Sequence, residues 1–484
     1  MIPFDPAKYD YTPEEMLKAA ASDRLLTCEI EFNRSCNYRC PYCYAAGKYD
    51  RAALEPELAR QVIRDVAKLG ARKIVVLGGE PLLCKNLCEY VELAESLGMG
   101  SEIFTNASLI DAPLAKFFYD HGCRVVVKLN SLRPEVQEKL TGVPGALDKA
   151  LRAIDTLQAA GMDEQRLAAS SVICSVNEAE VVGLWKYLRD RGVKPYLEIM
   201  TPQGRLLEHR ELEVHPRRLK EIFDEICAFD RERGFEWDPQ PPLVGAKCLR
   251  HQYSCVIGAG GDVTPCVGLT VALGNVHEQP LADILRGSNV MRRLKKFRET
   301  IKGPCRSCDK ADSCYGCRGA AYQLTGDYLA SDPLCWRNCD ELLALPPELP
   351  CDATQFLPHR PPMTMVETLL EVGEWSTIET TVAPDNRFLR DGVLDPEAIP
   401  EIVAQGCAAI TGFEQADRHL KGMLTGIRNV TIPGVIRAGD KLRIRMRETD
   451  ELDAYHILYF RFFRCVGGEE ELCAEGEMSI CGIP

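Results

Sequence analysis

Six short β-rich runs alternate with helical stretches between residues 25 and 200, and this alternation constrains the fold more than any other feature. The intervening segments place apolar residues three and four positions apart, as amphipathic helices do. Because parallel neighbouring strands need crossover connections, which are usually helices, the pattern predicts a parallel α/β sheet. It leaves open whether that sheet is flat or curled into a partial barrel. The expected strands are Thr27–Phe32, Lys73–Leu77, Ser101–Phe104, Arg124–Leu129, Leu167–Ile173 and Tyr196–Met200, with helices such as Glu57–Leu69, Ala146–Ala160 and Glu178–Arg191.

The chain has 484 residues, 23 cysteines and a net charge of −13. That charge argues against nucleic acid as the main partner. No apolar run approaches the ~18 residues of a membrane span, and the N-terminus lacks the basic and apolar segments of a signal peptide. We therefore expect a cytoplasmic protein with reduced thiols, in which metal binding accounts for a large share of the cysteines.

Composition divides the remainder of the chain. Six cysteines fall between Cys305 and Cys339, and six prolines fall in the linker-like stretch Leu345–Pro362. Beyond it, the apolar helix Ile399–Phe413 must be buried, and three strand-like runs follow it at Lys441–Arg447, Ala454–Arg464 and Leu472–Ile480. The expected organisation is an N-terminal extension (1–24), the α/β core (25–214), a bridging helix and linker (215–247), a cysteine-rich domain (248–344), a proline-rich linker (345–355) and an α+β domain (356–484).

Cys36, Cys40 and Cys43 follow the first expected strand in the pattern CxxxCxxC. Three thiolates at this spacing can ligate three irons of a 4Fe–4S cluster and leave the fourth iron open. Half of a zinc site is the alternative, but zinc sites usually combine two spaced pairs into four ligands. With Gly78-Gly79-Glu80-Pro81 about 35 residues later, the motif strongly resembles the radical S-adenosylmethionine (SAM) enzymes.

This resemblance implies that the three cysteines hold a cluster whose open iron chelates SAM. Tyr42 would lie against the adenine, and Gly78, Gly79, Glu80 and Pro81 would bind the methionine amino group. Short polar residues also follow the later strands, at the edge where active groups of parallel sheets gather, although turns and caps use the same residues. As further SAM contacts we expect Thr105, Asn106, Asn130, Ser131 and Asn177.

The second cysteine block resembles the SPASM extension of peptide- and protein-modifying radical SAM enzymes, although its last short gap has two residues where that family usually has three. A zinc ribbon is the alternative. The resemblance implies two auxiliary 4Fe–4S clusters, three in total with the SAM-binding one, and Cys339 could exchange with Cys335. Val267 follows Cys266 where sulfatase maturases carry an acidic base, so we assign no base. The implied ligands are Cys248, Cys255, Cys266 and Cys317 for one cluster and Cys305, Cys308, Cys314 and Cys335 for the other.

The C-terminal segment has its own resemblance. Phe356-Leu-Pro-His359-Arg-Pro-Pro-Met363 and Glu401-Ile-Val-Ala-Gln405 look like hotdog-fold 3-hydroxyacyl-carrier-protein dehydratases. In those enzymes the acid works with a histidine from a Gly-His-Phe-Pro motif, whereas this chain has Asp391-Gly-Val-Leu there. Without that base we expect an acyl or carrier-protein binding module, with Glu401 as the candidate catalytic residue and His359 as a turn residue.

Three hypotheses for function follow. In the first, a radical SAM enzyme removes hydrogen from a peptide or protein under anaerobic conditions, with an electron donor such as flavodoxin or ferredoxin. In the second, the substrate is an acyl chain carried as an acyl-carrier-protein or CoA thioester. In the third, the chain is a non-catalytic iron–sulfur protein, which the intact CxxxCxxC and Gly-Gly-Glu-Pro motifs disfavour. Hotdog domains commonly pair, which makes a homodimer through this domain a further hypothesis.

Overall fold

The computed structural model describes residues 2–45, 52–240, 248–311, 314–339, 349–357, 359, 362–414, 421–452 and 455–483. The chain forms two compact units, Met1–Leu342 and Leu343–Pro484. Parts of both expected linkers (241–247 and 345–348), the expected strand start at residue 454, and residues 358, 360 and 361 of the C-terminal motif lie outside the described residues.

In the described part of the first unit, nine strands form one sheet in the order β6-β5-β4-β3-β2-β1-β7-β8-β9. Strands β1 to β6 pair in parallel with their sequence neighbours, which confirms the six predicted strands. Strand β7 continues the sheet in parallel beside β1, and β8 and β9 follow antiparallel. The strands are β1 (Thr27–Glu31), β2 (Lys73–Leu77), β3 (Gly100–Thr105), β4 (Arg124–Lys128), β5 (Leu167–Ile173), β6 (Lys194–Ile199), β7 (Val256–Ile257), β8 (Asp262–Thr264) and β9 (Gly274–Asn275).

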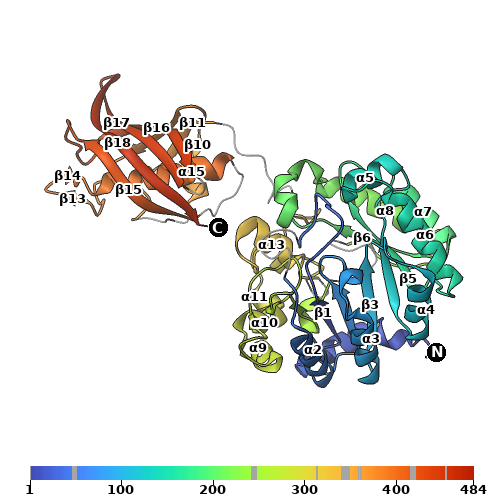
Figure 1. The fold of residues 1–484 in the computed structure, drawn as a ribbon. Coiled ribbons are helices and arrows are strands. Elements are labelled where there is room, and N and C mark those ends of the chain that lie inside the picture. Colours follow the sequence, from blue (N-terminus) through green and yellow to red (C-terminus); the bar gives the residue numbers. More distant parts are fainter. Residues whose placement is uncertain are drawn as a thin grey trace. The chain divides into compact units, whose positions relative to one another are not determined.

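Helices between the strands cover one face of this sheet (Figure 1). Helix α2 is typical, because Val62, Ile63 and Val66 recur at helical spacing and are buried in the main core. Burying each such side chain contributes roughly 1.5–3 kcal/mol. The helices are α1 (Pro13–Ala21), α2 (Pro56–Lys68), α3 (Leu87–Ser96), α4 (Ala112–Asp120), α5 (Pro134–Thr141), α6 (Ala146–Ala159), α7 (Val181–Asp190), α8 (Pro216–Glu232), α9 (Leu281–Gly287), α10 (Asn289–Lys295), α11 (Phe297–Thr300), α12 (Pro304–Ser307) and α13 (Arg318–Thr325), with short 3₁₀ turns η1 (Pro6–Lys8), η2 (Pro81–Leu83), η3 (Gly204–Glu208), η4 (Arg210–Leu212) and η5 (Arg250–Gln252).

The six parallel strands curl into a partial barrel, which answers the question that the sequence left open. Arg250 donates from Nη1 to Glu29 Oε1 on β1 (2.7 Å) and from Nη2 to the Tyr196 hydroxyl on β6 (3.1 Å). In a flat sheet β1 and β6 would be about 24 Å apart, five strand spacings, which one arginine cannot span. The sheet therefore bends until both strands reach the same guanidinium.

Alternation along β1 places apolar side chains outside the barrel and carboxylates inside it. On β1, Cys28 and Ile30 face the helices and belong to the main core, whereas Glu29 and Glu31 point to the other face. Both carboxylates are buried, at 4% and 1% exposure. Buried charges need partners, and Arg34 donates to Glu31 (2.8 Å) as Arg250 does to Glu29.

The second unit contains a seven-stranded sheet among its described residues, in the order β10-β11-β12-β16-β17-β18-β15, all antiparallel. The predicted apolar helix is confirmed as α15 (Ala398–Glu414), and it lies against one face of the sheet (Figure 1). Ile399, Ile402 and Val403 are at most 3% exposed in the core that the helix shares with the sheet. The elements are β10 (Cys351–Asp352), η6 (Ala353–Phe356), β11 (Thr368–Glu371), β12 (Ser376–Thr381), β13 (Leu389–Arg390), β14 (Val393–Leu394), β15 (Lys421–Thr431), β16 (Lys441–Leu452), β17 (Tyr455–Val466) and β18 (Glu469–Ile483).

Candidate functional site

The loop that carries Cys36, Cys40 and Cys43 leaves the carboxyl end of β1 and is anchored by backbone hydrogen bonds from three other elements. The segment after β2 anchors its start, the end of α5 its middle, and the turn after β6 its end. The barrel rim therefore fixes the path of the loop along its whole length. The three bonds run from Glu80 N–H to the Ser35 carbonyl (2.8 Å), from Arg39 N–H to the Thr141 carbonyl (2.9 Å) and from Arg205 N–H to the Cys43 carbonyl (3.1 Å).

Two of these anchors require glycine. A side chain at Gly79 would overlap the carbonyl oxygens of Arg34 and Ser35, and one at Gly204 would overlap the carbonyl oxygen of Cys43. Gly204 also has φ +57°, which side chains rarely adopt. Gly79 thus serves first to let the Gly-Gly-Glu-Pro segment pack on the cysteine loop. Contact of Gly78 to Pro81 with SAM stays a prediction.

The three thiols of the loop lie close enough to affect one another. Burial raises the pKa of Cys40 to about 12, and the Cys43 and Cys36 thiols add to the rise. Burial also raises the pKa of Cys36, whose Sγ accepts a hydrogen bond from the Tyr38 N–H (3.4 Å). Such thiols are neutral at pH 7 until a cationic group binds, and N–H donors aimed at sulfur suit iron–sulfur ligands. The donor set therefore fits a 4Fe–4S cluster.

The Glu80 side chain joins the ends of β2 and β3. Its carboxylate accepts hydrogen bonds from the Thr105 hydroxyl (2.5 Å), the Asn106 N–H (2.8 Å) and the Leu82 N–H (3.0 Å). Burial raises the pKa of Glu80, and these donors hold it down. Asn106 also donates from Nδ2 to Asn37 in the cysteine loop (2.8 Å). Three predicted site residues, Glu80, Thr105 and Asn106, thus form one buried network beneath the loop.

Asn130, Asn177 and Tyr42 form a second network at the same rim. Asn130 donates from Nδ2 to the Tyr42 hydroxyl (2.7 Å), and Asn177 donates from Nδ2 to the Asn130 carbonyl (2.8 Å). Both asparagines are at most 1% exposed. Ser131 is equally buried and donates to Glu180 (2.8 Å). The structure brings these predicted residues together as supports for Tyr42 and the strand ends, and their direct contact with SAM stays a prediction.

Sequence reasoning missed several polar groups inside the barrel. Lys128 lies with Nζ 5.4 Å from the centre of the Tyr42 ring, and burial lowers its pKa while Glu198 on β6 opposes that shift. The Tyr44 hydroxyl and Glu29 Oε2 are buried without a hydrogen-bond partner in the described part of the chain. Charged residues at alternate positions of otherwise apolar strands were the signal available, because such residues must face a polar interior.

The cysteine-rich region brings together Cys248, Cys266 and Cys317, which we call the first auxiliary set. Burial raises the pKa of Cys317, and the Asp332 carboxylate and the thiols of Cys248 and Cys266 raise it further. The pKa of Cys266 rises to about 12 from burial, with Cys248 adding to it. These three predicted ligands are therefore neighbours.

Cys255, the predicted fourth member of this set, lies elsewhere. Its thiol is fully buried in the main core, 3.7 Å from the Cys28 thiol. Cys255 directly precedes β7, which pairs with β1, and this register turns the side chain toward the helices. The structure does not bring Cys255 to the other three cysteines, so the fourth-ligand prediction fails on geometry.

We call the other four predicted ligands, Cys305, Cys308, Cys314 and Cys335, the second auxiliary set. Burial raises the pKa of Cys335 to about 12, with contributions from Asp332, Cys305 and Cys314, and the pKa of Cys314 is raised by burial, Cys305, Asp332 and Cys308. Backbone N–H groups point at the sulfurs, from Lys310 to Cys308 (3.5 Å) and from Gly316 to Cys314 (3.3 Å). Cys339 is also buried nearby, one helical turn after Cys335.

Among the described residues, no three or more His, Cys, Asp or Glu side chains group so as to hold a metal ion. A 4Fe–4S cluster places each thiolate on a different iron, so its ligands need not converge on one point. The cysteine sets therefore stay predicted cluster ligands.

In the second unit, the helix residue Glu401 has a histidine beside it. His359 Nε2 lies 3.7 Å from Glu401 Oε1, and both side chains are about one-third exposed, at 35% and 32%. Gln405 donates from Nε2 to Glu401 (2.8 Å) and to the Met363 carbonyl (2.7 Å), which ties the His359 segment to the helix. The Asp391-Gly-Val-Leu segment, in which we expected no histidine base, forms the turn and second strand of the hairpin β13–β14. We expected His359 to be only a turn residue, and its contact with Glu401 could not be read from the sequence.

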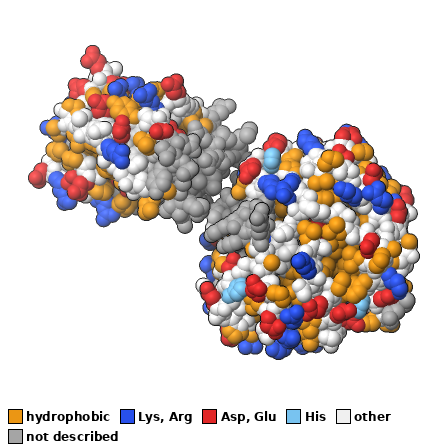
Figure 2. Space-filling view, in the orientation of Figure 1, with side chains coloured by type: hydrophobic (Ala, Val, Ile, Leu, Met, Phe, Trp, Pro, Cys, Tyr) orange, Lys and Arg blue, Asp and Glu red, His pale blue; other side chains and the backbone are white. Residues whose placement is uncertain are grey.

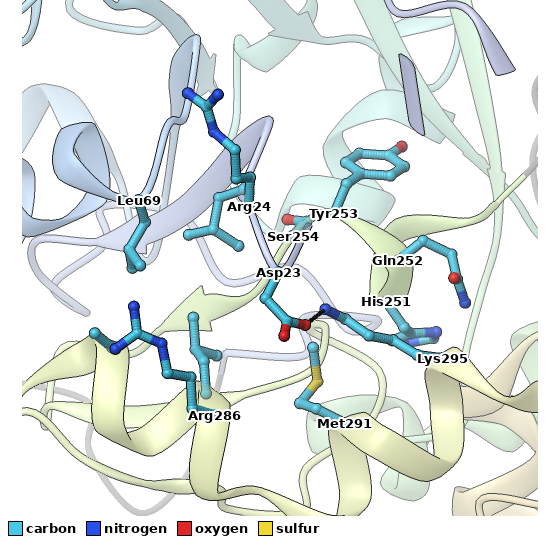
Figure 3. A pocket seen from close by; sticks show the side chains of 13 residues that line it. Asp23, Arg24, Leu69, His251, Gln252, Tyr253, Ser254, Arg286, Met291 and Lys295 are labelled. Carbon is cyan, nitrogen blue, oxygen red and sulfur yellow. Dashed lines mark hydrogen bonds and ion pairs between the residues drawn. The ribbon is translucent and has the colours of Figure 1, made fainter. Parts of the chain in front are cut away.

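Outside these sites, a cavity of about 30 Å³ lies between the segment before β1, η5 and the helices α9 and α10 (Figure 3). Lys295 crosses it to pair with Asp23 (2.6 Å). About two waters would fill this volume, so it is too small for a substrate.

Lys and Arg alternate with Asp and Glu over the visible face of both units, without an extended basic patch there (Figure 2). This mixed surface agrees with the net charge of −13. In the described part of the chain, every helix is too short or too polar to cross a bilayer.

Three family models match the chain: the radical SAM superfamily at residues 30–188, the SPASM iron–sulfur cluster-binding domain at 248–309, and the ApeP dehydratase at 351–482. An AdoMet-dependent heme synthase of Methanosarcina barkeri is 26% identical over 66% of this chain and 98% of its own length. A PqqA peptide cyclase of Gluconobacter oxydans is 26% identical over 63% of this chain and 88% of its own.

Among solved structures, Streptococcus suis SuiB is similar in fold, with a TM-score of 0.53 over 66% of this chain in its complexes with S-adenosylmethionine and with the precursor peptide SuiA. The two comparisons give 17% and 16% identity and cover 80% and 78% of SuiB. The chain thus combines a radical SAM core, a SPASM domain and a C-terminal ApeP-like dehydratase domain with the hotdog arrangement. It is a radical SAM enzyme of the SPASM type.

Proposed function

We propose that this enzyme removes a hydrogen atom from a peptide or protein substrate, with a 4Fe–4S cluster at Cys36, Cys40 and Cys43 and one auxiliary 4Fe–4S cluster in each auxiliary set. Reductive cleavage of SAM at the first cluster would supply the 5′-deoxyadenosyl radical. The observation that supports the proposal is the grouping of ten cysteines, most of them partly buried, into three sets, one at the barrel rim and two in the cysteine-rich region. The core would span residues 25–214, and the auxiliary domain 248–344.

The residues of the chain would hold SAM and exclude water from it. Tyr42, steadied by Asn130, would lie against the adenine, and the backbone from Gly78 to Pro81 would receive the methionine amino group. Thr105, Asn106, Ser131 and Asn177 would keep the strand ends in place around it. Because these side chains are buried and hydrogen-bonded, the rim is set before any ligand arrives, which lowers the entropic cost of binding.

The polar interior of the barrel supports a polar substrate. The Tyr44 hydroxyl and Glu29 Oε2 are a donor and an acceptor with no partner among the described residues, and a buried polar group without a hydrogen bond costs about 1–3 kcal/mol. A peptide backbone offers both a carbonyl and an N–H to such groups, whereas an alkyl chain offers neither. This favours the peptide hypothesis over the acyl-chain hypothesis for the radical step.

Anaerobic reconstitution with dithionite and SAM tests the proposal. The parent protein should form 5′-deoxyadenosine, and Cys43→Ala should abolish it. Cys88→Ala, at an exposed cysteine on α3, is the matched control and should behave like the parent. If the parent protein forms no 5′-deoxyadenosine, the result would contradict the radical SAM proposal and favour a non-catalytic iron–sulfur protein.

A second activity is favoured by one observation, the approach of His359 to Glu401. We propose that the domain spanning 356–484 binds carrier or CoA thioesters and interconverts 3-hydroxyacyl and 2-enoyl groups. The His359 imidazole would take the C2 proton, the C3–oxygen bond would break, and the Glu401 carboxyl group would give the departing hydroxide its proton to form water. Proton transfer from His359 to Glu401 would restore the pair.

Hydration of crotonyl-CoA by the full chain, followed by the loss of enoyl thioester absorbance, tests this second activity. Glu401→Gln and His359→Gln should each lower the rate at least about 100-fold, the usual contribution of a general acid or base. The control is His456→Gln, because His456 also pairs with a glutamate, Glu448 (2.7 Å), but on a strand of the sheet. If the parent hydrates crotonyl-CoA no faster than either variant does, the dehydratase proposal is wrong. The domain would then be a binding module or a dimerisation domain.

A further inference from the structure

Asp332 lies between the two auxiliary sets and hydrogen bonds to one cysteine of each. Its backbone N–H donates to Cys305 Sγ of the second set (3.5 Å). Its side-chain Oδ2 accepts a hydrogen bond from the backbone N–H of Cys317, a member of the first set (2.7 Å). Asp332 is completely buried. One residue therefore fixes the two sets relative to each other.

The surroundings of Asp332 hold its side chain in a single place. A Cβ at Gly316 would lie 2.6 Å from the Asp332 Cβ, so the chain passes this point only because residue 316 is glycine. Oδ1 accepts a hydrogen bond from the Leu334 N–H (2.9 Å). Both carboxylate oxygens are thus bonded to backbone N–H groups, an arrangement that stabilises the charged form.

A buried arginine balances this carboxylate. Arg318, next to Cys317, is 1% exposed and donates from Nη1 to the carbonyls of Tyr328 (3.1 Å) and Ala330 (2.6 Å). Its Nε and Nη2 have no hydrogen-bond partner in the described part of the chain. Burial raises the pKa of Asp332, and the Cys317 N–H, the Arg318 charge and the Leu334 N–H oppose that rise. A carboxylate and a guanidinium that are both buried at the boundary between two ligand sets cost free energy to desolvate.

We propose that Asp332 is a positioning residue for both auxiliary clusters, holding one ligand of each and setting their two reduction potentials together. This rests on the proposed function, because it requires a cluster in each set. Hydrogen bonds to cluster ligands and nearby charge set the potential of an iron–sulfur cluster. A carboxylate between two clusters disfavours the added electron on either one, and it couples them through Cys317 and Cys305.

The test uses the full chain with Cys36, Cys40 and Cys43 all replaced by alanine, so that only auxiliary clusters are reconstituted. Redox titration followed by electron paramagnetic resonance gives the potential of each cluster. With Asp332→Asn, both potentials should move in the positive direction, because a negative charge between the clusters is removed. The control is Asp327→Asn. Asp327 accepts from the Leu329 N–H (2.9 Å) in the same kind of turn but pairs with Lys302, so both potentials should stay at the parent values.

The outcomes separate the two proposals. Two auxiliary clusters of four irons each predict about eight irons in the variant that lacks only Cys36, Cys40 and Cys43. If it binds markedly fewer, the cluster assignment itself fails. If it binds about eight and Asp332→Asn moves one potential or neither, the role of Asp332 is wrong. Asp332→Asn could instead keep the circular dichroism of the parent and bind less iron. Loss of all eight irons would then agree with the proposal, because both clusters depend on Asp332. Retention of about four irons contradicts it.

Discussion

The two cysteine regions of the first unit are held in place by different means. The CxxxCxxC loop is anchored by backbone groups at the ends of β2, α5 and β6, with glycines at the contact points. The auxiliary sets lie on short helices and loops and are organised by buried polar side chains, above all Asp332 and Arg318. The first region thus inherits its geometry from the barrel, whereas the second depends on a few charged residues. Each should therefore fail under a different kind of substitution.

The largest expected effect is at the backbone contacts of the loop. Gly79→Ala places a methyl group 2.2 Å from the carbonyl oxygen of Ser35 and 2.4 Å from that of Arg34, so the backbone of the cysteine loop must shift. We expect loss of the SAM-site cluster, about four of about twelve irons, and of 5′-deoxyadenosine formation, with both auxiliary clusters retained. Iron analysis and electron paramagnetic resonance measure this.

The matched control for that substitution is Gly183→Ala in α7, where nothing lies within 4 Å of the added methyl group. Alanine favours a helix, so this variant should be as stable as the parent or more so, with its iron unchanged. Equal iron loss in both variants would contradict the view that the loop is shaped by close backbone contacts.

Arg250→Met is expected to separate the cysteine-rich region from the barrel. The change leaves Glu29 buried without its partner and removes the bridge to Tyr196, at a cost of about 1.5–3 kcal/mol in unfolding free energy. Iron should be lost from the first auxiliary set, which includes nearby Cys248, before the second. Chemical unfolding and cluster-specific spectra follow both effects. Arg306→Met, on the exposed surface of α12, should change stability by no more than about 0.5 kcal/mol.

Acid should weaken the auxiliary region through His251. Burial lowers the pKa of His251 to about 3, with Arg318 and Arg250 adding to the shift. Below the ordinary value near 6.5 the unfolded chain binds a proton that the folded chain excludes, so stability falls between pH 6.5 and 3, by about 1.4 kcal/mol per pH unit. Unfolding of the parent and of His251→Gln at pH 7 and pH 5 measures this. An equal loss in the two proteins would exclude His251 as the cause.

The smallest effect should come from α1, which belongs to neither region. Glu15 bonds to Arg72 and caps the helix at Thr12, and the Arg72 hydrogen bond is the main reason that its pKa is lowered to about 2. The resulting stabilisation is present above pH 4.5 and is lost as the pH falls toward 2. Because the Glu15 side chain is 40% exposed to solvent, Glu15→Gln should shift the unfolding midpoint only slightly and leave cluster content unchanged. A loss of iron in this variant would show that cluster loading responds to general stability.

Much of the barrel could be predicted from the sequence because apolar residues recur at clearly different spacings in its strands and its helices. All six core strands appear within two residues of their expected ends, and the three cysteines of CxxxCxxC lie at the rim as expected. In the cysteine-rich region, Cys314 and Cys335 lie near the Cys305–Cys308 pair. The spacing of nearby cysteines is enough to predict that they lie together, because residues only a few positions apart share one loop.

Contacts that join distant segments could not be predicted. The SPASM resemblance offers Cys255 as a fourth ligand, but the pairing of β7 with β1 turns its side chain toward Cys28. Arg250 contacts the barrel from the cysteine-rich region, and Asp332 contacts both auxiliary sets. Their partners are distant in sequence, so only the folded structure brings them together. The approach of His359 to Glu401 depends likewise on how Gln405 ties the preceding segment to α15.

Anaerobic iron and sulfide analysis of the full chain tests the central claim most directly, beside the variant lacking Cys36, Cys40 and Cys43. Three 4Fe–4S sites predict about 12 irons in the parent and about 8 in the variant, with 5′-deoxyadenosine formed by the parent alone. A parent that binds about four irons, or mostly zinc in its cysteine-rich region, would contradict the account.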